Sequence, residues 1–177
     1  HNDDGFSELG TLSHESLGMN WYYRPFNASE LQASFHRIHE KRRGGNDFDR
    51  PEHEADIAES LTHERWGGKL RWSQKIGPAW NYQAYYSFSI MDRDSYYGGL
   101  AGSSPTDSIE ALNYYGRTKN QTHALGIQST YAVATHQITF GGQYSTDHLD
   151  DKSVKDARYF IDHTYTNSGL FIQDDFT

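Results

Sequence analysis

The chain contains no cysteine, and it has no run of about 18 apolar residues. The absence of cysteine excludes a disulfide framework and a thiolate metal site, and it leaves the compartment open. The absence of a long apolar run excludes a transmembrane helix. Basic residues are also few, since 16 Lys and Arg stand against 24 Asp and Glu, for a net charge of −8. We therefore expect no nucleic-acid partner, because phosphate binding needs a concentrated basic surface.

Catalytic motifs are absent as well. The sequence shows no nucleophile elbow, no zincin helix and no phosphate-binding loop. Its many carboxylates could pair as in a glycosidase, but no segment favours such a pair. We therefore expect that the protein is not an enzyme.

Aromatic residues are abundant, at 15% of the chain, although the hydrophobic fraction is only 35%. Many of them alternate with polar residues, as in the segment from Trp80 to Ile90. A period of two indicates β-strands, because successive side chains point to opposite faces. Each such strand would have one apolar face and one polar face.

The alternation predicts seven strands, and the connections between them follow a regular order. The predicted ranges are about 13–23, 30–39, 63–75, 80–92, 121–131, 136–146 and 165 to the end. Short connections lie near Pro25, Gly77 and Ala134, and long polar loops follow Glu40, Asp92 and Asp147. The alternation fails at Arg37 and Ile38, which predicts either a bulge or the point where the strand leaves a bilayer.

Short turns at one end and long loops at the other are typical of outer-membrane β-barrels. The predicted strands, of about 10 to 13 residues, exceed the usual length in soluble proteins and suffice to cross a bilayer. Trp21, Trp80 and Tyr131 lie beside short turns, which predicts an aromatic girdle at one interface. We predict an all-β fold, an antiparallel meander of about seven long strands that forms part of a transmembrane β-barrel wall.

Three segments resemble a known family: residues 40–59, residues 92–98 and residues 169–176. They are similar to the barrel region of TonB-dependent outer-membrane receptors of the Bacteroidota type. The resemblance covers most of the chain; it is specific in the first loop and generic in the strands. It implies a fold in which a 22-stranded barrel surrounds an N-terminal plug.

The resemblance also implies a function, the import of a scarce nutrient such as cobalamin, a siderophore, haem or a glycan. The expected partners are outer-membrane lipid, the nutrient, and the TonB complex acting through the plug. Seven strands cannot close such a barrel, and the first residues, 1–10, do not resemble a signal peptide. We therefore expect residues 1–177 to be a partial barrel domain without the plug, in the outer membrane of a Gram-negative bacterium.

Four residues are candidates for binding the ligand. Arg42 and Arg43 carry guanidinium groups that suit a carboxylate or a phosphate. The alternative is an ion pair with nearby acids. Tyr96 and Tyr97, beside two glycines, suit a flat or sugar-like ligand, and packing within the loop is an equal alternative.

The first loop is rich in carboxylates and could bind calcium, which prefers oxygen ligands. The candidate ligands are Asp47, Asp49, Glu52, Glu54 and Asp56. Their spacing is not that of an EF-hand, and a solvated acidic loop is the alternative.

Two other kinds of protein remain open. A complete eight-stranded barrel with a structural or adhesion role would show one more strand and a closed register. A secreted, carbohydrate-binding β-sandwich would be soluble without detergent and would have shorter strands.

Overall fold

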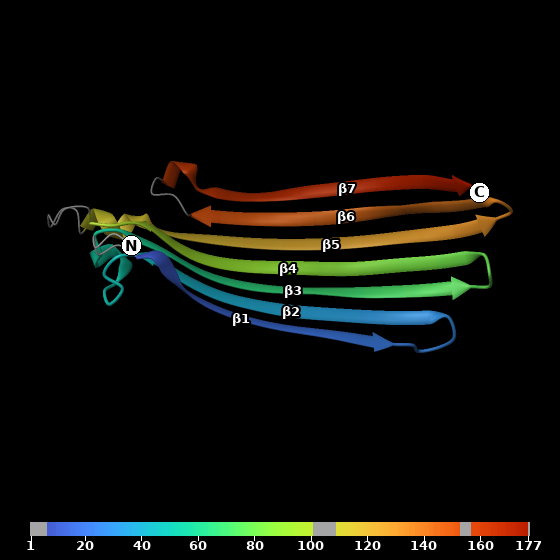
Figure 1. Ribbon diagram of the computed structural model, residues 1–177. Coiled ribbons are helices and arrows are strands. Elements are labelled where there is room, and N and C mark those ends of the chain that lie inside the picture. Colours follow the sequence, from blue (N-terminus) through green and yellow to red (C-terminus); the bar gives the residue numbers. More distant parts are fainter. Residues whose placement is uncertain (1–6, 101–108, 153–156, 177) are drawn as a thin grey trace.

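The computed structural model describes residues 7–100, 109–152 and 157–176. It shows one antiparallel sheet of seven strands in meander order (Figure 1). The strands have 16 to 19 residues each. They are β1 (Ser7–Tyr23), β2 (Ser29–Gly45), β3 (Ala58–Ile76), β4 (Trp80–Gly98), β5 (Tyr115–Val133), β6 (His136–Lys152) and β7 (Ile161–Phe176). The seven predicted strands and their order are confirmed, and the sheet is not closed.

The strands extend further toward the long loops than the alternation predicted. β5, for example, begins at Tyr115 rather than near Gln121, because main-chain pairing continues where both faces become polar. The predicted bulge at Arg37 and Ile38 is absent, since these residues pair in unbroken register with Trp66 and Arg65. The irregular pattern there reflects a change of side-chain type along a regular strand.

The three short turns lie together at one end of the sheet, and each extends further than the one before (Figure 1). Ser29 at the start of β2 pairs with Gln74, and β3 continues to Ile76. Trp80 at the start of β4 pairs with Tyr131, and β5 continues to Val133. The hairpins are therefore staggered by a constant step, as in a sheet that curls with a regular shear.

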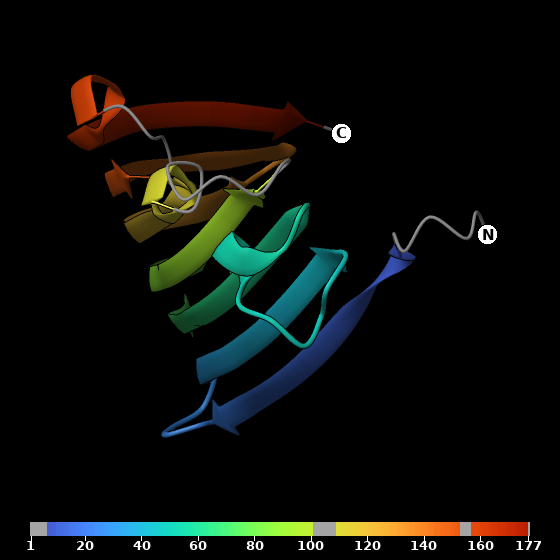
Figure 2. The same ribbon diagram turned by 90° about the vertical axis from the view of Figure 1, so that its left-hand side faces the viewer.

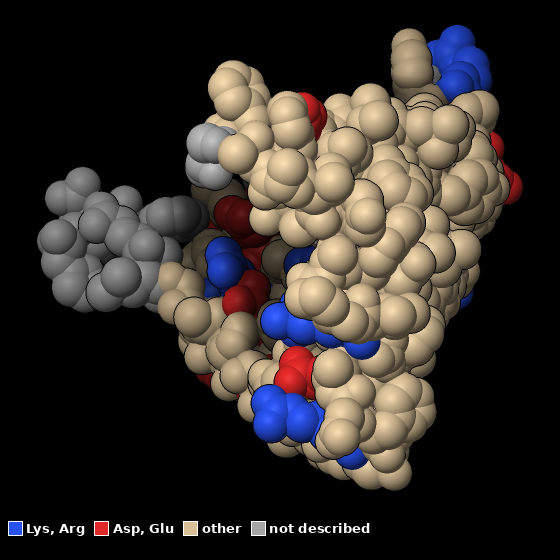
Figure 3. Space-filling model, turned by 90° about the vertical axis from the view of Figure 1, so that its right-hand side faces the viewer, with Lys and Arg blue, Asp and Glu red and all other residues tan. Residues whose placement is uncertain are grey.

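The register divides the sheet into an apolar face and a polar face. One row of the apolar face, at the middle of the strands, contains Trp21, Ala33, Leu70, Tyr86, Leu125 and Tyr144. The row at the same position on the polar face contains Asn20, Ser34, Lys69, Ser87, Ala124, Ser145 and Asn167. Seen from the turn end, charged side chains gather in a hollow on one side, and the broad surface beside it carries little charge (Figure 3).

The apolar face keeps this character only over the half of the sheet nearer the turns. We call this part the apolar band; on β4 it runs from Trp80 to Ile90. Two residues further along, the same face carries a charged row that consists of Glu15, His39, Glu64, Asp92, Lys119, Asp150 and Asp162. The boundary between the two is abrupt on β4, where Asp92 follows Ile90 on the same face.

The sheet is a single layer in Figure 2, with β1 and β7 at opposite edges. The apolar band is exposed: Leu125 is 56% exposed, Ile127 62% and Leu170 92%. The buried hydrophobic cluster of the described residues lies at the loop end and consists of Ala55, Ala58 and Tyr96. Among the described residues, no helix is long and apolar enough to span a membrane. Within the described residues, the apolar band is therefore left exposed, away from the buried cluster.

Candidate functional site

The loop end of the sheet brings the candidate residues to the two faces of one rim. Arg43 pairs with Ser60, Ser60 with Tyr96, and Tyr96 with Tyr115, so these four share a row on the apolar side. Arg42 and Tyr97 occupy the neighbouring positions and point to the polar side, because side chains alternate along a strand. The four candidates thus lie close together at the rim, but Arg43 and Tyr96 point to the apolar side and Arg42 and Tyr97 to the polar side.

The first half of the rim consists of Tyr96, Tyr114, Tyr115 and Arg43. We call this cluster the tyrosine site. Tyr96 is fully buried, and its ring centroid lies 4.6 Å from that of Tyr115 and 6.5 Å from that of Tyr114. The first loop contains a short 3-10 helix, η1 (Glu52–Glu54), whose Glu52 contacts Tyr115. The backbone N–H of Leu100 donates to the carbonyl of Ala55 at 2.8 Å, which ties the second loop to the first. The first loop, the described start of the second loop and the strand ends therefore form one small packed unit.

Hydrogen bonds connect the first loop to this unit. The Tyr115 hydroxyl donates to Glu52 Oε2 at 3.1 Å, and His53 Nδ1 lies 3.0 Å from the same hydroxyl oxygen. Asn46 closes the base of the loop, since its side-chain oxygen accepts from the backbone N–H of Ile57 at 3.0 Å. A loop anchored at both its base and its helix can hold side chains in fixed positions.

The carboxylate of Glu52 is held in its ionised form. Burial opposes ionisation, but hydrogen bonds to its own backbone, to Ser60 and to Tyr115, together with the charge on Arg43, outweigh burial, and the pKa of Glu52 is lowered. Burial, assisted by the charge of Glu52 and the hydrogen bond to it, raises the pKa of Tyr115 to about 12. Tyr115 therefore remains a hydrogen-bond donor throughout the physiological range.

Two donors of the tyrosine site have no hydrogen-bond partner among the described residues. They are Nη2 of Arg43 and the hydroxyl of Tyr96. Arg43 is only 8% exposed, its guanidinium carbon lies 5.8 Å from the centroid of the Phe48 ring, and its other terminal nitrogen donates to the carbonyl of Gly44 at 3.4 Å. Buried donors of this kind suit a ligand with acceptor oxygens.

The second half of the rim is a groove on the polar side, which we call the rim groove. Its volume is about 520 Å³, and its lining includes Arg42, Glu59, Leu61 and Tyr97. Arg42 Nε lies 2.7 Å from Glu40 Oε1, so Arg42 forms the ion pair with a nearby acid that was the alternative reading of the sequence. Tyr97 remains 55% exposed and is available for contact. The groove therefore offers both charged and apolar side chains and one accessible aromatic ring.

The candidate calcium ligands are not gathered in this structure. Asp47 and Asp49 lie in the loop before η1, whereas Glu52 is engaged by Tyr115. Among the described residues, no group of three or more His, Asp or Glu side chains is placed to hold a metal ion. Calcium binding by the first loop stays a prediction from the sequence.

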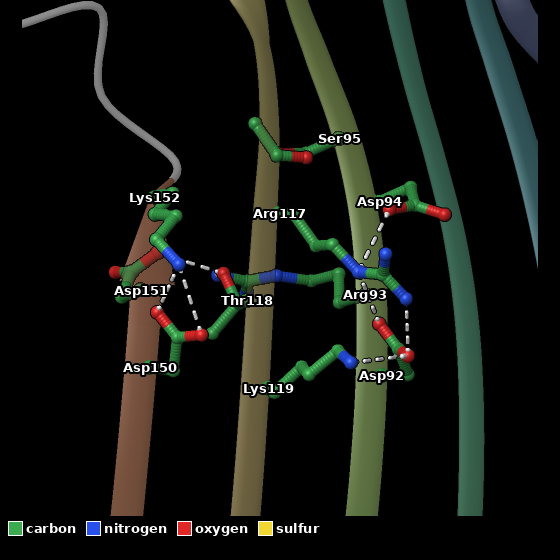
Figure 4. Close-up of polar contacts among 11 residues, drawn as sticks. Asp92, Arg93, Asp94, Ser95, Arg117, Thr118, Lys119, Asp150, Asp151 and Lys152 are labelled. Atoms are coloured by element: carbon green, nitrogen blue, oxygen red, sulfur yellow. Dashed lines mark hydrogen bonds and ion pairs between the residues drawn. The ribbon is translucent and has the colours of Figure 1, made fainter. Parts of the chain in front are cut away.

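Between the apolar band and the rim, basic side chains pair with acids of the charged row. Arg117 makes two hydrogen bonds to the carboxylate of Asp92, at 3.1 and 2.7 Å (Figure 4). Lys119 lies 4.0 Å from the same carboxylate, and Lys152 lies 3.1 Å from Asp150. Cross-strand register places Arg117 and Lys119 of β5 beside Asp92 of β4, which stabilises the pairing of these strands, whereas Lys152 and Asp150 lie on the same strand.

Sequence reasoning missed Tyr115, His53 and Ser60. Tyr115 lay inside the predicted second loop, and its position beside Tyr96 depends on a register that continues beyond the alternating segment. His53 reaches Tyr115 only because the first loop folds over the strand ends. The adjacent aromatics Tyr114 and Tyr115 were the one signal available.

Comparison with family models, with curated proteins and with solved structures finds no match to this chain.

Proposed function

We propose that this chain forms part of the wall of an outer-membrane transport barrel of a Gram-negative bacterium, as its resemblance to TonB-dependent receptors implies. The observation that carries the proposal is the exposed apolar band, which lies opposite a polar face and ends abruptly at the charged row. A soluble protein buries such a surface against a second layer, and all seven strands here belong to one sheet.

The dimensions of the apolar band suit a bilayer. From Trp80 to Ile90 it covers about ten residue steps, or about 33 Å along the strand at about 3.3 Å per residue. A strand tilted by about 40° would then span about 25 Å, the height of the apolar band in outer-membrane barrels. The charged row would lie at the level of the lipid headgroups, and the rim would lie outside.

The unpaired edges of the sheet support membership of a larger barrel. β1 and β7 do not pair with each other, and an open edge in a bilayer leaves main-chain groups without hydrogen bonds. The constant stagger of the hairpins is the shear that a closing barrel needs. Further strands would therefore complete the wall on both sides.

The aromatic contacts near the turns fit the same orientation. The ring centroid of Trp80 lies 5.4 Å from that of Tyr82 and 4.7 Å from that of Tyr131, so residues of two strands form one aromatic surface. Such rings favour the boundary between hydrocarbon and water. The turn end would then face the periplasm.

Within this proposal, the tyrosine site and the rim groove take part in capturing a nutrient outside the cell. Tyr97 supplies an exposed ring, and Arg43 supplies a guanidinium nitrogen without a hydrogen-bond partner among the described residues. Uptake of cobalamin, haem and siderophores, compared between the wild-type strain and a deletion of the whole gene, would identify the nutrient. Uptake unchanged for all three would contradict a role in importing any of them.

The orientation of the wall can be tested with two adjacent thiols. Leu125 belongs to the apolar band and Ala124 to the polar face at the same height, and the chain has no cysteine of its own. In intact outer membranes that contain the full-length protein, we expect a water-soluble maleimide to label Ala124→Cys and to leave Leu125→Cys unlabelled. Detergent denaturation should expose both thiols. Equal labelling in intact membranes would overturn the proposal.

A further inference from the structure

The polar face of β3 carries a line of positive charge that the proposed function does not explain. The line, which we call the basic stripe, consists of Arg65, Lys69, Arg71 and Lys75. All four point to the polar face, because they lie at odd positions of a regular strand. They extend along the part of β3 that lies behind the apolar band, on the opposite side of the sheet.

The basic stripe has two gaps, at Gly67 and Ser73, and the first is filled from the neighbouring strand. Position 67 is glycine, and the imidazole of His36 on β2 lies over it: a Cβ built on Gly67 would clash with Cε1 and Nε2 of His36. Any side chain at position 67 would displace this ring. From position 65 to position 71 of β3, each position on the polar face therefore has a nitrogen-bearing side chain, which is that of His36 at Gly67.

The basic stripe is poorly neutralised by its surroundings. Its one ion pair among the described residues joins Arg71 to Glu30 at 3.8 Å. Arg65 donates to the neutral Ser89 hydroxyl at 3.1 Å, and Lys69 Nζ lies 4.9 Å from the centroid of the Tyr85 ring. The cross-strand neighbours of Lys69 are two serines, Ser34 and Ser87.

On the other face of the sheet, by contrast, arginines pair closely with acids. There, Arg37 lies 2.8 Å from Glu64, and Arg117 lies 2.7 Å from Asp92. Like charges two residues apart on one strand repel each other, and this cost is larger where water is restricted. A chain with a net charge of −8 has many acids available for pairing, yet few stand beside these cations.

We propose that the basic stripe binds anionic solutes that carry carboxylate or phosphate groups and guides them along the polar face of the wall. The proposal rests on the proposed function, because it takes the polar face to be the lumen of a barrel. Lysine and arginine bind such groups by charge and by hydrogen bonds, and a line of them concentrates anions locally. The exposed ends of Arg65, Lys69 and Lys75 leave room for successive contacts.

The charge of the basic stripe can be measured with single thiols in the full-length protein. Ser87 adjoins Lys69, and Ser145 lies in the same row of the polar face, three strands from β3. We would measure the rates at which Ser87→Cys and Ser145→Cys react with an anionic and with a cationic methanethiosulfonate reagent. At low salt the ratio of the anionic to the cationic rate should be about tenfold higher at Ser87→Cys, since nearby cations attract the anionic reagent.

The matched variants remove charge from opposite faces. Lys69→Gln combined with Arg71→Gln should bring the rate ratio at Ser87→Cys to that at Ser145→Cys. Lys41→Gln removes one positive charge from the other face of the sheet and should leave the ratio unchanged. Reaction with an uncharged thiol reagent checks that each variant folds with the same exposure.

Binding of a solute is tested by protection. Citrate, and separately inorganic phosphate, should slow modification of Ser87→Cys and not of Ser145→Cys at a fixed ionic strength set with chloride. Equal rate ratios at the two thiols, or no selective protection, would overturn the proposal. A Ser87→Cys thiol that reacts with neither reagent would indicate a protein segment on the basic stripe, and this outcome also contradicts solute binding. Failure of these tests is distinct from failure of the barrel, which the pair Leu125→Cys and Ala124→Cys reports.

Discussion

Single residues show where the backbone of this sheet is under strain. The turn between β5 and β6 contains Ala134, whose φ is +54°. The left-handed region is costly for a residue with a Cβ, by about 1–2 kcal/mol. Gly77 has a φ of +59° in the corresponding turn between β3 and β4, where glycine avoids this cost. Two turns at the same end of the sheet thus have the same left-handed conformation, one at an alanine and the other at a glycine.

We expect Ala134→Gly to raise the free energy of unfolding by about 0.5–1 kcal/mol, because relief of the left-handed strain exceeds the added freedom of the unfolded chain. Ala134→Val should lower it, since a β-branched residue fits this region worse. Urea unfolding of the refolded protein in detergent micelles provides the measurement. A loss of stability in the glycine variant would show that the strain is not present.

The Glu52 carboxylate makes the loop end sensitive to acid. Its pKa is lowered in the folded state, so the stabilisation is present above the ordinary value of 4.5 and is lost as the pH falls through the lowered value. We expect limited proteolysis of the first loop to accelerate as the pH falls below 4.5 and through the lowered pKa of Glu52. The control is Glu52→Gln, in which the loop should be cut faster at neutral pH and with less dependence on pH. A wild-type rate that is flat between pH 7 and pH 3 would refute this assignment.

Whole strands derive their character from the face that each side chain occupies. β7 illustrates this, because its run Leu170–Ile172 is apolar at every position and leaves the face ambiguous in the sequence. Pairing with β6 places Leu170 and Ile172 on the apolar face and Phe171 on the polar face. The Phe171 ring lies over Gly141, where a Cβ would be 2.8 Å from Cζ. A glycine on one strand therefore accommodates an aromatic ring of the next.

Neighbouring positions on β5 should respond in opposite ways to a charge. Ile127 lies in the apolar band and Gln128 on the polar face. We expect Ile127→Arg to lower the free energy of unfolding from lipid by about 2–4 kcal/mol, the cost of arginine near the middle of a bilayer. Gln128→Arg should change it by less than about 1 kcal/mol. Folding titrations in lipid vesicles would compare the two, and equal costs would contradict a lipid-facing band.

The molecule as a whole is a sheet with two open edges and an exposed apolar surface. Its buried cluster is small and lies at the loop end, away from the apolar band. The sheet is held together by pairing between adjacent strands. Among the described residues, the only other elements that pack against it are the short helices at the loop end. Such a sheet depends on its surroundings, both for partners at β1 and β7 and for cover over the apolar band.

We expect the chain expressed alone to aggregate in aqueous buffer and to be dispersed by detergent. The reason is the exposed band of large hydrophobic residues, including Leu170 at 92% exposure. Sedimentation and light scattering with and without detergent would measure this. A monodisperse protein in plain buffer would favour a soluble protein over a piece of a membrane wall.

Much of the fold was predictable, because the alternation of side chains is a local property of a strand. Trp80 to Ile90 shows its two faces in the sequence, and the short turns near Gly77 and Ala134 were located correctly. The strand ends were not predictable in this way. From Asp92 to Ser95 both faces are polar, so the pattern fades although the backbone pairing continues.

The neighbours across strands required the three-dimensional structure. Tyr96 and Tyr115, or Gly67 and His36, are far apart in the chain, and they meet because turn length and register align their rows. A shift of one residue would send every side chain of a strand to the other face. Composition and periodicity therefore determine that this chain forms strands with an apolar and a polar face. The pairing register determines that several acids of one face lie beside arginine or lysine, while the basic stripe on the other face is left largely unpaired.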